Sequence, residues 1–228
     1  MKLRNAVAGL LVTLSMVQPV MAAGWTQLSE NQWKFFDNAG NLSYNTFIGT
    51  YWVGPDGTWI QSTIPRDELT NDSVGKRIIA VSKSAQNVEL WENGQLTKTY
   101  ACISGQNPGD KVMEGDRKTP VGRFFIGKKT TATAYTRALV ISYPNAEDVY
   151  RGLQTGLISS AKAIEMNTAL SQGILPDQHT PLGGLIELHG ATGKIGTNAS
   201  SGCVVLSVPD IIDLYNRVFP GDEVRIFE

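Results

Sequence analysis

From residue 77 onward the chain consists of short apolar runs separated by turn signals, and this spacing restricts its fold more than any other feature. Two β-rich runs, 77–83 and 88–91, precede Asn93-Gly94, a dipeptide that favours a two-residue hairpin turn, and a third run follows at 96–104. Further short runs lie at 122–127, 138–143, 184–188, 204–206 and 223–227. Many short strands joined by turns predict a mainly β domain over 76–228.

Helices are predicted in two places within this domain. The stretch 146–173 lacks strand alternation and favours one or two helices, 147–153 and 159–171, with glycines between them. A final helix is expected from Ser207, an N-cap with Pro209 in the first turn, to about Val218. The predicted fold class is therefore α+β, mainly β, and we expect the stretch 146–173 to form a lid or wall over a cleft.

The first 22 residues have the pattern of an export signal. Lys2 and Arg4 precede an apolar run at 6–17, and Val20-Met21-Ala22 then precedes Ala23-Gly24. An apolar run of about a dozen residues is too short to span a bilayer. We expect cleavage near Ala22, which leaves an exported protein, at the cell wall, the cell surface or the periplasm, without a membrane span.

Charge and length limit the remaining possibilities. The 228 residues leave room for one full domain and a small second one. The net charge is −1, from 20 basic and 21 acidic residues, and no basic block is present. Nucleic acid is therefore not an expected partner.

The segment 24–60 differs in composition from the rest and is predicted to form a small module of β-hairpins. It holds four of the five tryptophans, around two turn signals, Asp37–Gly40 and Asp56-Gly57. The segment resembles the choline-binding or cell-wall-binding repeats of surface proteins. That resemblance implies a cell-wall ligand held by the aromatic rings, and packing of these rings against the main domain is the alternative. The four tryptophans are Trp25, Trp33, Trp52 and Trp59. Residues 61–75, polar and proline-bearing, are the predicted linker.

The sequence has two cysteines, Cys102 and Cys203, and they have different surroundings. Cys102 lies inside a strand-like run, which favours a buried structural thiol. Cys203 follows Gly202 and opens the apolar run 204–206, whereas His189 lies at the end of the run 184–188 and precedes Gly190. Small polar residues fill the loop between them, so we expect it to fold tightly enough to bring thiol and imidazole together.

These residue types suit nucleophilic catalysis. A thiolate is the attacking species, and a free thiol with a pKa of about 8.5 is mostly protonated at neutral pH. An adjacent imidazole can accept that proton and return it to a leaving amine. The amides of Gly202 and Cys203 are candidate oxyanion donors. On these residues alone, catalysis and an unrelated packed thiol remain equally good interpretations.

The pattern of His-Gly, a small polar loop and Ser-x-Gly-Cys resembles the L,D-transpeptidase catalytic domain, also called YkuD-like. Three further segments match in order: the hairpin at 77–94, Gly115-Asp-Arg-Lys-Thr-Pro-Val-Gly-Arg-Phe125, and Gly221-Asp-Glu-Val-Arg225. The resemblance covers about 76–228 and implies a YkuD-like β-sandwich. Two positions depart from the family pattern: Ser201 replaces a histidine, and Val205 replaces an asparagine or arginine.

The resemblance implies a role for each site residue. Cys203 is the nucleophile and His189 the base, with backbone support from Gly202, Gly190 and Ser201. A backbone carbonyl near Gly190 is expected to orient His189, with Glu187 as the alternative. Arg123 and Tyr143 are candidate substrate contacts, and no cofactor or metal is expected.

The implied function is transpeptidation of peptidoglycan tetrapeptide stems through a thioester, which gives 3→3 cross-links and a target for carbapenems. An L,D-carboxypeptidase that uses the same pair is the first alternative, and an inert wall-binding surface protein is the second. A metallopeptidase is disfavoured because the chain has only two histidines and lacks a His-Glu-x-x-His motif. A serine penicillin-binding enzyme is disfavoured because Ser73-Val-Gly-Lys76 lies in the predicted linker and a Lys-Thr-Gly element is missing.

Overall fold

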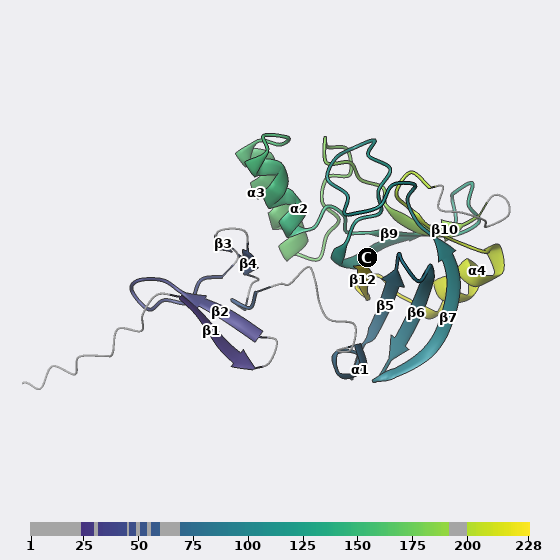
Figure 1. Ribbon diagram of the computed structural model, residues 1–228, viewed down its shortest axis with the longest axis horizontal. Coiled ribbons are helices and arrows are strands. Elements are labelled where there is room, and N and C mark those ends of the chain that lie inside the picture. Colours follow the sequence, from purple (N-terminus) through teal and green to yellow (C-terminus); the bar gives the residue numbers. More distant parts are fainter. Residues whose placement is uncertain are drawn as a thin grey trace, which may run out of the picture.

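A computed structural model describes residues 24–29, 32–44, 46–48, 51–53, 56–59, 69–191 and 200–228. Figure 1 shows the β-rich body, a helical layer at one end of it, and a small group of N-terminal strands. The predicted signal peptide, residues 61–68 of the predicted linker and residues 192–199 of the loop between His189 and Cys203 lie outside the described residues.

Eight strands form the body, and they close into a barrel in the order β10-β11-β7-β6-β5-β12-β8-β9. Their bounds are β5 Arg77–Ser82, β6 Asn87–Glu92, β7 Gln95–Ile103, β8 Gly122–Thr130, β9 Ala138–Ile141, β10 Glu187–Gly190, β11 Val204–Leu206 and β12 Glu223–Phe227. Each coincides with one of the predicted apolar runs to within a few residues. The mainly β fold class is thereby confirmed.

Two long strands join the two halves of this barrel. β7 pairs with β6 in one sheet and with β11 in the other, and β8 likewise pairs with both β12 and β9. Each of these two strands has nine residues, against three to six in the others, so it is long enough to take part in both sheets. The two faces of the expected sandwich are thus continuous at both edges.

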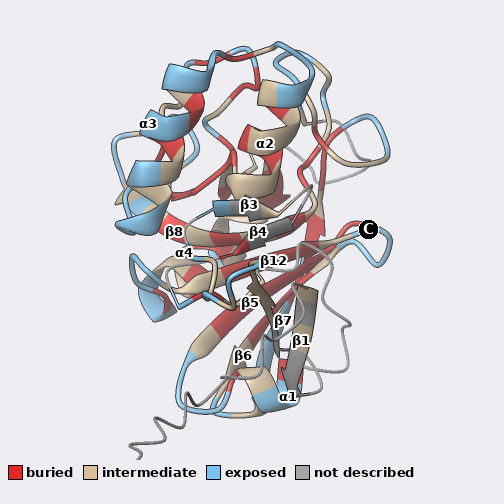
Figure 2. Cartoon of the chain, turned by 90° about the vertical axis from the view of Figure 1, so that its left-hand side faces the viewer, coloured by how far each residue is buried: buried red, intermediate tan, exposed pale blue. Residues whose placement is uncertain are grey.

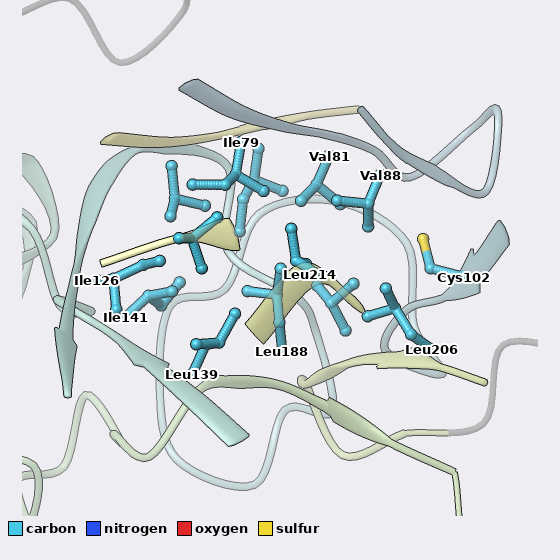
Figure 3. Close-up of a cluster of buried hydrophobic side chains, with 14 of the residues drawn as sticks. Ile79, Val81, Val88, Cys102, Ile126, Leu139, Ile141, Leu188, Leu206 and Leu214 are labelled. Carbon is cyan, nitrogen blue, oxygen red and sulfur yellow. The ribbon is translucent and has the colours of Figure 1, made fainter. Parts of the chain in front are cut away.

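The interior of the barrel is filled by aliphatic side chains from both sheets and by helix α4 (Val208–Arg217). Figure 3 shows Leu188 of β10, Leu206 of β11 and Leu214 of α4 pointing into one cluster. α4 begins as predicted: the hydroxyl of Ser207 accepts a hydrogen bond from the Asp210 N–H at 3.2 Å, and Pro209 lies in the first turn. Because α4 follows β11 directly, the packing of Leu214 also fixes the strand that follows Cys203.

Helices α2 (Ala146–Gln154) and α3 (Ser160–Ser171) form the predicted helical insertion ahead of His189. Their inner faces, with Leu182, make a second apolar cluster, and their outer faces are exposed in Figure 2. Asn145 caps α2 through a capping box with Asp148. Arg151 of α2 then donates to Asp110 at 2.9 Å and to the carbonyl of Lys111 at 2.6 Å, which anchors the insertion to the loop ahead of β8.

The N-terminal module consists of two two-stranded sheets, β1 (Gly24–Ser29) with β2 (Gln32–Phe36) and β3 (Thr46–Ile48) with β4 (Tyr51–Val53). Isolated bridges, Phe36 with Leu42 and Val53 with Trp59, span the two predicted turns. β4 packs against α2, and Val53 is fully buried. The module therefore contacts the helical insertion as well as folding on itself.

Part of the predicted linker is structured. Helix α1 (Leu69–Asp72) precedes β5, and Leu69 is buried with Ile78 and Ala80. Asp72 forms an ion pair with the buried Arg225 at 2.7 Å. This part of the predicted linker packs on the barrel. Among the described helices, none combines the length and the apolar character that a membrane span requires.

Candidate active site

Of the two predicted catalytic residues, His189 lies on β10 and Cys203 lies one residue before the neighbouring parallel strand β11. β10 and β11 pair with Leu188 opposite Val204 and His189 opposite Val205. Leu188 and Val204 face the core, so the pleat directs His189 to the outer face of the sheet, and Cys203, one residue before β11, lies beside Glu187 on that face. The fold thus brings the thiol and the imidazole to the same side of one strand pair.

The imidazole of His189 is held from two sides. Its Nδ1 lies 2.9 Å from the carbonyl oxygen of Gly190, so this nitrogen donates and Nε2 is left to accept a proton. The ring of Tyr135 stacks on it with centroids 4.0 Å apart. Burial lowers the pKa of His189, which is only 7% exposed. The predicted orienting partner, a carbonyl near Gly190, is confirmed, and the neutral imidazole has the form that a base requires.

Cys203 is a free, partly buried thiol. Its Sγ donates to the carbonyl oxygen of Leu185 at 3.6 Å. Burial raises the pKa of Cys203 to about 11, opposed by the backbone N–H of Glu187 and by the charge of Lys111, while the charge of Glu187 raises it further. The thiol is therefore protonated at neutral pH, and a nucleophilic role would require a base.

The peptide that precedes Cys203 is fixed by Thr119, the threonine of the Thr-Pro motif. The buried hydroxyl of Thr119 donates to the carbonyl of Gly202 at 2.8 Å and accepts from the N–H of Gly105 at 2.8 Å. Gly202 has φ +134°, and a Cβ there would come within 2.8 Å of the Lys118 carbonyl oxygen. A glycine is therefore required before Cys203, and the hydrogen bond from Thr119 determines the orientation of the peptide.

The backbone N–H groups predicted to support the site differ in whether they already donate a hydrogen bond within the protein. The N–H of Gly202 donates to the hydroxyl of Ser200 at 3.1 Å, and that hydroxyl donates to the Cys203 carbonyl at 2.6 Å. The N–H of Gly190 is directed to the carbonyl of Tyr135 at 3.2 Å. Within the described residues the N–H groups of Gly202 and Gly190 have partners, which leaves the N–H of Cys203 as the remaining predicted donor. Ser201 is exposed.

The two predicted substrate contacts lie elsewhere in the fold. Tyr143 is fully buried, and its hydroxyl donates to the Leu182 carbonyl at 2.9 Å, so it presents no free group to a substrate. Arg123 projects from β8 toward β12, where it pairs with Glu223 at 3.5 Å and Asp72 at 3.8 Å. The structure assigns these two side chains to the framework, which corrects the sequence-based expectation.

Some residues of the site were missed by sequence reasoning. The many charged residues of the loop 110–118 are typical of a solvated face, but Lys111 is buried. It is 3% exposed and donates to Asp116 and to the Met113 carbonyl, both at 2.9 Å. Tyr135 carries no motif, and only its contact with His189 identifies it. Thr119 could have been found, because a threonine before a proline in a turn-rich segment is a candidate for backbone hydrogen bonds.

His179 is the other histidine of the sequence and would be the alternative base. His179 is exposed, and its N–H donates to Asp177 at 2.9 Å in a surface loop. Across the described ranges, no three His, Cys, Asp or Glu side chains gather in a way that could hold a metal ion.

Among solved structures, the Pgp2 protein of Campylobacter jejuni, described as a helical cell shape determining protein, matches with 21% identity over 72% of this chain and 55% of that chain, at a TM-score of 0.47. Bd1075 of Bdellovibrio bacteriovorus matches with 22% identity over 67% of this chain and 48% of that chain, at 0.45. An L,D-transpeptidase of Xylanimonas cellulosilytica matches with 15% identity over 77% of this chain and 74% of that chain, at 0.43. The chain thus spans about half the length of the first two. No curated protein matches it.

The sequence itself matches a family model over residues 76–226, from the start of the barrel to its last strand, and the description of that model is L,D-transpeptidase catalytic domain. The matched range contains β10, β11 and the Thr119 loop. The chain therefore belongs to the YkuD family of L,D-transpeptidase catalytic domains.

Proposed function

We propose that the protein is an exported cysteine L,D-transpeptidase that acts on peptidoglycan tetrapeptide stems. The observation that carries the proposal is the placement of Cys203 and His189 on one face of the β10–β11 pair, with Nδ1 of the imidazole held by the Gly190 carbonyl. Family membership supplies the reaction class, and the N-terminal pattern of Lys2, Arg4 and an apolar run supports export.

In the first half-reaction Cys203 attacks the carbonyl of the third stem residue. The thiol turns from the Leu185 carbonyl toward His189, whose Nε2 takes the proton as the S–C bond forms. The N–H of Cys203 stabilises the oxyanion. The bond to the terminal D-Ala then breaks, His189 returns the proton to the departing amine, and a thioester remains on Cys203.

In the second half-reaction the side-chain amine of another stem attacks the thioester. His189 takes a proton from the attacking nitrogen and returns it to the departing thiolate, so the product is a 3→3 cross-link and the enzyme is regenerated. No step needs a cofactor. If water attacks instead, the product is a tripeptide stem and the same residues act as an L,D-carboxypeptidase.

The N-terminal module is proposed to bind the wall through its aromatic side chains. The supporting observation is compositional, since four of five tryptophans lie in 24–60. Trp59 is partly buried, whereas the side chains of Trp25, Trp33 and Trp52 lie outside the described residues. Binding of choline-containing walls by the isolated chain, and its loss in a Trp52→Ala variant, would test this part of the proposal.

Incubation with a tetrapeptide muropeptide, followed by mass analysis, tests the enzymatic proposal. Cross-linked dimers are the expected product, tripeptides alone would indicate the carboxypeptidase, and an unchanged substrate would contradict both. A carbapenem provides an independent test, because one acyl adduct on Cys203 is expected. The absence of any adduct would favour the inert wall-binding protein. Cys102→Ala is the matched control, because it removes the other thiol and leaves the site intact.

A further inference from the structure

Glu187 is a carboxylate of the active site to which the mechanism above gives no role. By the β10–β11 register it lies directly beside Cys203, and its backbone N–H interacts with the thiol. Ile186 and Leu188 on either side are core residues, so the carboxylate faces outward with His189. Its side chain is partly buried. Nucleophile, base and carboxylate therefore share one face of two short strands.

None of the described residues places a cation in an ion pair with the Glu187 carboxylate. Burial raises the pKa of this carboxylate, opposed only by the charge of Lys128. Lys128 lies two strands away on β8, opposite Val140 of β9, which pairs with Glu187. The orienting partner of His189 is the Gly190 carbonyl, so Glu187 does not serve that role either.

This placement works against the nucleophile. A negative charge beside a thiol disfavours the thiolate, and here the charge of Glu187 adds to the burial that already raises the pKa of Cys203. A glutamine of the same shape would avoid that repulsion. A residue that lowers stability or reactivity at its own position is expected where another function requires it. A partly buried carboxylate that has no ion pair among the described residues is suited to a cation that arrives with the substrate.

The reaction brings such a cation to this position. The attacking group of the second stem is a primary amine, which is mostly an ammonium at neutral pH because its pKa resembles that of lysine, about 10.4. The ammonium must lose one proton before its nitrogen can attack the thioester. Glu187 lies next to the sulfur that bears the acyl group, so a nitrogen that approaches the thioester passes within reach of its carboxylate.

We propose that Glu187 is the residue that selects an amine over water, by binding the ammonium of the acceptor stem and taking its first proton. This inference rests on the proposed transpeptidase function. The ammonium transfers one proton to the Glu187 carboxylate, and the free amine attacks the thioester carbon. His189 then takes the second proton and delivers it to the departing Cys203 thiolate. The carboxylic acid returns its proton to solvent after the product leaves.

Partition between the two products tests the assignment. An isotope-labelled tetrapeptide muropeptide serves as acyl donor, and an unlabelled tripeptide stem, which has the side-chain amine but no D-Ala to lose, serves as acceptor, so that the labelled tripeptide reports hydrolysis and the labelled dimer reports transfer. For Glu187→Gln we expect the ratio of dimer to tripeptide product to fall at least tenfold and the KM for the acceptor to rise. Acylation of Cys203 by a carbapenem should proceed at the wild-type rate or faster, because the repelling charge is gone. Glu165→Gln, which removes an exposed carboxylate on α3, is the matched control.

The outcomes separate this inference from the function on which it rests. An unchanged product ratio in Glu187→Gln, with normal carbapenem acylation, overturns the role of Glu187 and leaves the transpeptidase intact. A wild-type enzyme that forms the carbapenem adduct and gives only tripeptide at every acceptor concentration also overturns it. Absence of both adduct and product in the wild type contradicts the proposed function itself. Slower carbapenem acylation in Glu187→Gln would assign the residue to the first half-reaction and would also overturn the inference.

Discussion

The two cysteines show that the same residue type can have two different environments within a single sheet. Cys102 lies on β7 and Cys203 directly precedes β11, and these two strands pair through Cys102 and Leu206. Cys102 is 3% exposed, points into the core in Figure 3, and burial raises its pKa to about 12. Cys203 lies just before its strand begins, on the outer face and beside the base. The face of the pleat and the distance from the strand end, rather than the residue type, decide which thiol can react.

The backbone around the two thiols differs in the same way. Cys102 lies inside the regular ladder of a nine-residue strand. Cys203 follows a glycine in a left-handed conformation, and that glycine is held by Thr119 and Ser200. A regular strand needs no side chain to fix its peptide groups, whereas the turn before Cys203 depends on these two hydroxyls. The reactive thiol is therefore the one whose position is set by specific side-chain contacts.

The largest expected effect is the loss of all acylation when Cys203 is removed. Cys203→Ala should form no carbapenem adduct and no product, because no other described thiol has access to solvent. Cys102→Ala should retain the full rate. Measuring the protein mass after reaction with a carbapenem checks both variants. An adduct on Cys203→Ala would show that the comparison assigns the nucleophile wrongly.

Removal of the base should have the next largest effect. His189→Ala leaves a thiol with a raised pKa and no proton acceptor, so we expect acylation to slow by about 10²–10⁴-fold. The rate of carbapenem adduct formation measures this change. His179→Ala, at the exposed histidine, is the control and should react like the wild type. Substantial activity in His189→Ala would place the base elsewhere.

Much of the fold and of the catalytic pair is predictable from the sequence, and the reason is local. Asn93-Gly94, the cap at Ser207 and the short apolar runs act over a few residues, and they predict the strands and α4 correctly. The surroundings of the pair depend on contacts between distant segments. Tyr135 reaches His189 from the β8–β9 loop, and Thr119 holds Gly202 across 83 positions of sequence. The burial of Tyr143 and Lys111 was not predicted for the same reason, since residue type alone does not reveal burial in a tertiary contact.

The hydrogen bonds that Thr119 makes with the Gly202 carbonyl and the Gly105 N–H can be tested with a pair of substitutions. Thr119→Val removes the hydroxyl at nearly constant shape and leaves the Gly105 N–H and the Gly202 carbonyl without their partner. A buried unsatisfied group costs about 1–3 kcal/mol, so we expect acylation to slow by roughly tenfold or more. Thr119→Ser keeps the hydroxyl and should restore most of the rate. Equal rates for the two variants would reduce Thr119 to a packing residue.

The pH dependence should differ between the base and the thiols. Burial lowers the pKa of His189 below its usual 6.5, so the neutral base persists to a lower pH, and kcat/KM should fall on the acid side only below pH 6.5. Alkylation of Cys203 by iodoacetamide without substrate should be slow at pH 7 and increase as the pH approaches 11. Cys102 should react more slowly still. An acid limb above pH 6.5 would contradict the buried neutral imidazole.

The smallest effect is expected at Cys102, and it should appear in stability alone. Cys102→Ala removes one sulfur from the core beside Leu206, which should lower the free energy of unfolding by about 1 kcal/mol. Cys102→Ser places a hydroxyl in the same apolar position and should cost about 1–3 kcal/mol, because its hydrogen bonds with water are lost. Chemical denaturation measures both values, and the carbapenem rate should be unchanged in each. If Cys102→Ser slows acylation while Cys102→Ala does not, the strain of the buried hydroxyl passes along the β7–β11 pairing to the nucleophile. The two thiols would then be mechanically linked, although only one of them takes part in the chemistry.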